Sequence, residues 1–329
     1  MRSIIINVAN AICLLFMVNA TSAQQAVQTD NYPTRPVRAI LGLPPGGGID
    51  LIARTVLTNL SEGFGVPFIL DNRAGAGGII ATELVAKSRP DGYTLLVSSA
   101  PFTIAPFLYT SSIHYDVRKD FAPITLIATQ RLLLVVNASV KANTLPELIA
   151  LAKARPGELN IGIADPGGGA TLAAELFKIV TNTKMVSIPY NGAAPALIAL
   201  MSNDVQLNFT TPAVAVPQLK SGKIKALAAT GNERASYLPD IPTLTELGIK
   251  DFNVGPSTGL VAPAKTPSSI IDKLYRQVAA GLKLPSTRER LVAAGVDIVG
   301  SSPKEYATFI NNQLETNSKI IKAAGLKID

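Results

Sequence analysis

Short apolar runs alternate along the chain with longer segments in which apolar residues recur every three or four positions. The short runs predict strands at residues 37–43, 67–70, 93–98, 132–136, 159–163, 186–188, 224–229 and 258–261. The periodic segments predict helices at residues 49–60, 78–87, 144–154, 169–180, 194–202, 268–282, 285–294 and 303–324. Strands and helices that alternate in this way indicate an α/β fold with a largely parallel sheet.

The first residues follow a different pattern. Arg2 precedes a mostly apolar stretch at residues 4–18, and small residues at 20–23 come before a polar segment. This arrangement is typical of a secretory signal peptide. The alternative, a membrane anchor, needs about 20 apolar residues, and asparagines interrupt the shorter run here. We therefore predict a signal peptide at residues 1–23, cleaved after Ala23, and a soluble mature protein in the periplasm.

Composition narrows the class of protein further. Hydrophobic residues make up 47% of the chain and charged residues 16%, which allows a sizeable core and argues against disorder. The net charge of +7 raises the question of nucleic-acid binding, but Lys and Arg are scattered, with no long run and no interleaved aromatics. The only cysteine, Cys13, lies in the predicted leader, so the mature chain has no disulfide and no cysteine-bound metal.

Two stretches of sequence echo each other, at residues 45–53 and 166–174. Both read Pro-Gly-Gly-Gly, carry Leu and Ala at matching later positions, and join a predicted strand to a predicted helix. Consecutive glycines let a ligand approach the backbone closely. The first amides of a helix lack intrahelical partners and lie at the positive end of its dipole. Two such turns on facing lobes would hold a small anion from both sides.

Other interpretations of the glycine turns stay open. Such turns also serve merely to connect a strand to a helix. Neither has the Lys-Ser/Thr ending of a nucleotide-binding loop or the spacing of the dinucleotide fingerprint. Asp50, in the first turn of its helix, either caps that helix or accepts a hydrogen bond from an ammonium or hydroxyl of the ligand.

Motifs along essentially the whole mature chain resemble one known family. In chain order they are Tyr32-Pro33-x-Arg35-Pro36-Val37-Arg38, Pro44-Pro45-Gly46-Gly47, Asn72-Arg73-x-Gly75-Ala76-Gly77-Gly78, Pro90-Asp91-Gly92-Tyr93-Thr94-Leu95, Tyr115-Asp116, Pro189-Tyr190-x-Gly192 and Leu238-Pro239-Asp240-Ile241-Pro242-Thr243. The series is similar to that of the Bug family, the TctC-like periplasmic receptors of tripartite tricarboxylate transporters.

The resemblance implies a type II periplasmic-binding-protein fold, with two α/β lobes around a cleft. In such a fold the chain crosses twice between the lobes, and here the crossing segments would fall at residues 127–132 and 253–258. Lobe 1 would then comprise 31–129 plus 255–329, and lobe 2 would comprise 130–254. It implies a monomer that captures a small organic acid through backbone amides, hydroxyls and water, without a cofactor. The partners would be membrane permease subunits of a TctA/TctB type or a signalling protein.

The echo and the resemblance together predict a substrate-binding site and no catalytic or metal site. Its residues follow predicted strands or open predicted helices, and they are Pro45, Gly46, Gly47, Gly48, Asp50, Ser98, Ser99, Ala100, Gly167, Gly168, Gly169, Thr171, Tyr190, Gly192 and Thr210.

The chain departs from the family pattern where the ligand should lie. Glycines at 167–169 replace a hydroxyl-bearing run, and Thr210 stands where the family has Asp. The hypothesis that follows is a pocket for a less polar acid, aromatic acids included, with Phe102 and Tyr190 nearby.

Two rival functions are open at the level of sequence. An exported hydrolase would have to use His114, the only histidine, but no Gly-x-Ser-x-Gly motif accompanies it. A purely structural or adhesive surface protein would bind no ligand, whereas a receptor would be stabilised by its ligand.

Overall fold

The computed structural model describes residues 31–164, 167–190, 192–235, 237–250 and 252–327. The predicted leader, with Cys13, lies outside these residues. From Pro33 onward the described residues belong to one compact unit. None of the described helices is long and apolar enough to span a bilayer.

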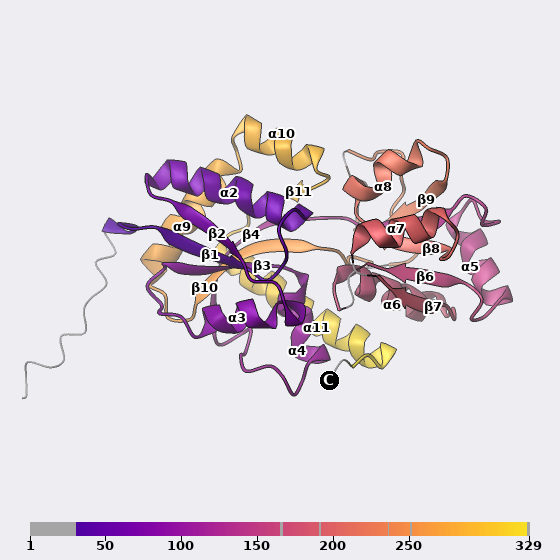
Figure 1. The fold of residues 1–329 in the computed structure, drawn as a ribbon, viewed down its shortest axis with the longest axis horizontal. Helices are drawn as coiled ribbons and strands as arrows, with labels where there is room; N and C mark the ends of the chain where they lie inside the picture. Colours follow the sequence, from indigo (N-terminus) through magenta and orange to yellow (C-terminus); the bar gives the residue numbers. More distant parts are fainter. Residues whose placement is uncertain (1–30, 165–166, 191, 236, 251, 328–329) are drawn as a thin grey trace, which may run out of the picture. The chain divides into compact units, whose positions relative to one another are not determined.

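Two sheets organise the described chain (Figure 1). The first is six-stranded in the order β11-β4-β10-β3-β1-β2, built from β1 (Val37–Leu41), β2 (Phe68–Asn72), β3 (Thr94–Ser98), β4 (Phe121–Thr129), β10 (Ser257–Pro263) and β11 (Asp297–Ile298). The second is five-stranded in the order β7-β6-β8-β5-β9, built from β5 (Leu133–Asn137), β6 (Asn160–Ile163), β7 (Val186–Pro189), β8 (Leu207–Thr210) and β9 (Ile224–Ala229).

Both sheets are mixed, so the prediction of a largely parallel sheet was wrong. Strand β1 runs parallel to β2 and β3, and β6 runs parallel to β7 and β8. Strand β10 runs antiparallel to β3 and β4, and β5 runs antiparallel to β8 and β9. The reason is the path of the chain: β5 enters the second sheet directly after β4, and β10 returns into the middle of the first.

Helices cover both sheets. They are α2 (Gly48–Phe64), α3 (Ile79–Ala86), α4 (Ala100–Leu108), α5 (Leu145–Ala154), α6 (Gly169–Thr181), α7 (Ala193–Met201), α8 (Pro212–Leu219), α9 (Ser268–Gly281), α10 (Pro285–Ala293) and α11 (Pro303–Ala324), with a 3-10 turn at Ala76–Gly78. Figure 1 shows α2 and α9 on one face of the first sheet, with α3, α4 and α11 on the other.

The hydrophobic core does not divide cleanly between the two sheets. One cluster combines Leu134 and Phe209 of the second sheet with Ile104 of α4 and Ile320 of α11. Residues of α4 and α11 also belong to the cluster of the first sheet, and α11 contacts both β4 and α6. The predicted lobe boundaries at 129/130 and 254/255 stay a prediction.

Candidate functional site

The first glycine turn connects β1 to α2 and is exposed. Gly46 has φ +89°, a conformation that a side chain would strain. Gly47 is the N-cap, with φ −83° and ψ 171°, and Gly48 is the first helical residue. The amide of Leu51 donates to the Gly47 carbonyl at 3.1 Å, so it makes the first intrahelical bond. The amides before it point out of the helix N-terminus.

The second turn connects β6 to α6 and repeats this backbone position by position. Gly167 has φ +82°, and Gly168 is the N-cap, with φ −105° and ψ −164°. Gly169 is the first helical residue, and the Leu172 amide donates to the Gly168 carbonyl at 3.2 Å. Pro166 of the motif lies outside the described residues. The sequence echo therefore corresponds to two turns of the same conformation.

In each turn, the amide of the first glycine is hydrogen-bonded to a side chain four residues later. The Gly46 amide donates to Asp50 Oδ2 at 3.1 Å, and the Gly167 amide donates to Thr171 Oγ1 at 3.2 Å. The equal spacing makes Asp50 and Thr171 counterparts. This contact favours the capping interpretation of Asp50.

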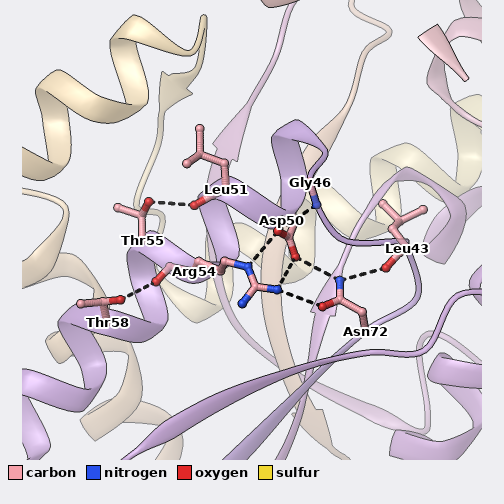
Figure 2. Close-up of polar contacts among 8 residues, drawn as sticks. All are labelled: Leu43, Gly46, Asp50, Leu51, Arg54, Thr55, Thr58 and Asn72. Atoms are coloured by element: carbon pink, nitrogen blue, oxygen red, sulfur yellow. Dashed lines mark hydrogen bonds and ion pairs between the residues drawn. The ribbon is translucent and has the colours of Figure 1, made fainter. Parts of the chain in front are cut away.

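Asp50 is held inside a polar network rather than presented to solvent (Figure 2). It is 5% exposed, accepts from Arg54 Nε at 2.8 Å and Arg54 Nη2 at 3.1 Å, and accepts from Asn72 Nδ2 at 3.0 Å. Burial opposes the charged form, but the hydrogen bonds from Arg54, Gly46 and Asn72 outweigh it and lower the pKa of this carboxyl. Asp50 is thus ionised at neutral pH and paired with a guanidinium. A contact between Asp50 and a ligand stays a prediction.

Both turns lie beside the segments that connect the two sheets. A Cβ on Gly48 would be 3.4 Å from Gln130 Nε2, and a Cβ on Gly169 would be 3.3 Å from Gly255 C and Pro256 N. The two segments are joined in turn, because the Gln130 amide donates to the Pro256 carbonyl at 2.8 Å. The first helical residues of α2 and α6 are therefore both next to one pair of crossing segments.

The predicted residues after β3 are largely engaged within the protein. Ser98 Oγ lies 2.6 Å from the Tyr306 hydroxyl, and both groups are buried. Burial raises the pKa of Tyr306, and the Ser98 contact opposes this less strongly, so the phenol is neutral. Ser99 is the N-cap of α4 and Ala100 its first, buried residue. Because β1 and β3 are parallel neighbours, these residues share a sheet edge with the first glycine turn.

In the second sheet, the remaining predicted residues also share one edge. Tyr190 and Gly192 follow β7, and their amides donate to Ile163 O at 2.8 Å and Ala164 O at 3.0 Å, beside the second turn. Thr210 ends β8 at 2% exposure, and its hydroxyl has no hydrogen-bond partner among the described residues. The carboxyl ends of parallel strands are where open α/β sheets bind ligands.

The two aromatic residues of the aromatic-acid hypothesis differ in their burial. Phe102 is 3% exposed and lies in the core with Phe121, at a ring-centroid distance of 5.1 Å. Phe102 also lines the very small cavity that contains Ser98 and Ser99. Its place beside the ligand stays a prediction. Tyr190 is partly buried against a core cluster under α7.

Only some of the predicted site residues line a cavity, and they line different ones. Gly167 and Thr171 line a cavity of about 220 Å³, and none of its lining residues belongs to the first turn. Ser98 and Ser99 line a separate, very small one. His114 is exposed, and its backbone amide donates to Glu83. Among the described residues, no group of three or more His, Cys, Asp or Glu side chains could hold a metal ion.

A family model described as "Tripartite tricarboxylate transporter family receptor" matches residues 52–326. The chain belongs to this receptor family. The receptor is 34% identical over 324 residues to Protein BugT of Bordetella pertussis, covering 98% of this chain and 99% of BugT. As a member of a receptor family it is a binding protein rather than an enzyme, and the hydrolase alternative at His114 is set aside.

Solved structures agree with this assignment. The receptor resembles the periplasmic binding protein BugD, with a TM-score of 0.76 and 31% identity, over 90% of this chain and 100% of that chain. It also resembles R. palustris Rpa4515, solved with adipate, with a TM-score of 0.79 and 32% identity, again over 90% and 100%. The predicted α/β fold of the periplasmic binding proteins is confirmed.

Three residues of the receptor that border the turns were not predicted as part of the site. Gln130, Gly255 and Pro256 approach the first residues of α2 and α6. The Gly-Pro pair within the predicted crossing at 253–258 was the available signal, since glycine permits close backbone approach. Nothing in the sequence around Gln130 distinguishes it from a surface amide.

Proposed function

We propose that this receptor binds a small carboxylate between its two glycine turns. The observation that carries the proposal is the closely similar backbone of the two turns, both of which lie beside the paired crossing segments. Rpa4515, which shares the fold at 32% identity, was solved with a carboxylate, adipate. The proposed site comprises the fifteen residues predicted from the sequence, extended by Gln130, Gly255 and Pro256.

Backbone amides supply the attraction for the anion. The first amides of α2 and α6 and the positive ends of both helix dipoles favour negative charge, by about 0.3–1 kcal/mol for each helix end. The Asp50 carboxylate does not cancel this attraction, because Arg54 neutralises it. A ligand held by both turns would stabilise the arrangement in which they are closest.

The rest of the proposal concerns the molecule in its cell. The chain is exported by its signal peptide, cleaved after Ala23, and works in the periplasm as a monomer. Lobe 1 comprises residues 31–129 and 255–329, and lobe 2 comprises 130–254. The loaded receptor delivers its acid to permease subunits of a TctA/TctB type or to a signalling protein. The family model, with its transporter receptor description, supports this role.

Valine at the N-cap or first residue of either helix tests the proposal. Gly48 is the first helical residue of α2 and has no positive φ, and Gly168 has φ −105° and ψ −164°. Other residues adopt both conformations, so Gly48→Val and Gly168→Val are expected to fold and to block the amides with γ-methyl groups. Isothermal titration calorimetry against a panel of mono- and dicarboxylates should show binding by the native chain and about a hundredfold weaker binding by each variant.

Ala138→Val, on an exposed residue beyond the opposite end of β5, is the matched control and should bind as the native chain does. Normal affinity in both glycine variants would reject the site. The absence of binding to every acid of the panel by the native chain would reject carboxylate binding itself.

A further inference from the structure

The cavity at the second glycine turn is lined by uncharged residues at one end and by a carboxylate at the other. Gly167 and Thr171 lie at one end, at the start of α6. Glu175 follows Thr171 by one helical turn, about 6 Å along the axis, and lines the other end with Ser187. The cavity therefore runs along the side of α6 from the second glycine turn, which forms one half of the proposed anion site.

Its walls are mainly apolar. Leu108 of α4, Ile163 of β6, Pro189 of β7 and Leu326, after α11, all line it. Leu108 and Ile163 are buried, whereas Pro189 and Leu326 are more accessible at its border. Hydrocarbon is the occupant that such walls favour, at about 0.8 kcal/mol for each buried methylene.

The far end is closed to a second negative charge. Glu175 is 8% exposed, and its Oε1 lies 2.7 Å from Lys178 Nζ and accepts from Ser187 Oγ at 3.0 Å. Lys178 Nζ also donates to Ser187 Oγ at 3.0 Å. A carboxylate placed here would be repelled by the Glu175 charge and would compete with it for Lys178. A methyl terminus meets no such repulsion.

We infer that the bound acid is a monocarboxylate whose hydrocarbon chain lies in this cavity. The inference rests on the proposed function, since the carboxylate of that acid is the group held by the glycine turns. It separates this receptor from Rpa4515, whose structure holds a dicarboxylate. The hydroxyl-poor second turn fits the same preference.

Hexanoate and adipate are the matched probes, because they differ only in whether the far end is a methyl or a second carboxylate. Calorimetry on the native chain should give at least about tenfold tighter binding for hexanoate. Glu175→Gln removes the repelling charge and leaves Lys178 available. This variant should therefore bind adipate more tightly than the native chain does, and its preference for hexanoate over adipate should be smaller. Equal or tighter binding of adipate by the native chain would overturn the inference.

A second variant tests the wall of the cavity. Leu326→Asn should weaken hexanoate binding about tenfold and leave acetate binding unchanged, since acetate has no chain to bury. Leu247→Asn, at an exposed leucine elsewhere, is the control and should change neither. Equal loss for both acids in Leu326→Asn would contradict the assignment.

The native chain distinguishes the two proposals. If no acid binds it, the proposed function fails; if acids bind without a preference for hexanoate over adipate, only the inference fails.

Discussion

At the scale of single residues, Asp50 and Thr171 make the same hydrogen bond to their glycine turns, one through a carboxylate and the other through a hydroxyl. Each accepts the amide of the first glycine of its turn, four residues before it. Asp50 adds a charge, which Arg54 and Asn72 satisfy. A buried carboxylate beside an anion site is therefore consistent with binding, because it braces the turn and its charge is paired.

Asp50→Ala is expected to lower the free energy of unfolding by about 2 kcal/mol at neutral pH, because Gly46 and Asn72 lose an acceptor and Arg54 loses its partner. The pKa of Asp50 is lower in the folded chain than its ordinary value. Its stabilisation is therefore complete above the ordinary carboxyl pKa and is lost as pH falls through the folded-state pKa.

Urea unfolding at a series of pH values measures this effect. The difference between native chain and variant should shrink toward strongly acidic pH. Asp240→Ala, at an exposed carboxylate, serves as the control. An Asp50→Ala variant as stable as the native chain at pH 7 would show that the network contributes nothing.

At the scale of elements, the crossing segments depend on one glycine. A Cβ on Gly255 would be 2.4 Å from the Gln130 carbonyl oxygen, which belongs to the backbone and cannot move freely. Gln130 and Pro256 are hydrogen-bonded at the same place. At this point the two connecting segments are therefore in direct backbone contact.

Gly255→Ala should destabilise the fold by about 2 kcal/mol, because the methyl group forces the two segments apart. Gly47→Ala is the matched control, since no atom lies within 4 Å of its Cβ position and its φ of −83° suits alanine. Thermal unfolding of the two variants compares them directly. Equal stability would mean that the segments separate at no cost.

The sequence predicts elements well where periodicity is long and poorly where proline interrupts it. All eight predicted helices are present with small shifts at their ends. Helix α4 was missed because Pro101 and Pro106 interrupt a short run, and α8 because Pro212 and Pro217 do the same. The direction of β5 and β10 depends on where the chain crosses between the sheets, which local pattern does not encode.

At the scale of the whole molecule, the repeated turn was predictable and its surroundings were not. The glycine motif alone predicted two equivalent strand-to-helix turns, and in the structure the two turns have closely similar backbone conformations. Their common position beside Gln130, Gly255 and Pro256 arises from contacts between segments distant in sequence. The same kind of contact buries Phe102 against Phe121, which local sequence does not reveal.

The most direct test of the central claim is a crystal structure of the protein with a bound short carboxylate. We expect one carboxylate group within hydrogen-bond distance of backbone amides from both glycine turns, at residues 46–48 and 167–169. A carboxylate bound elsewhere, with neither turn in contact with it, would contradict the claim.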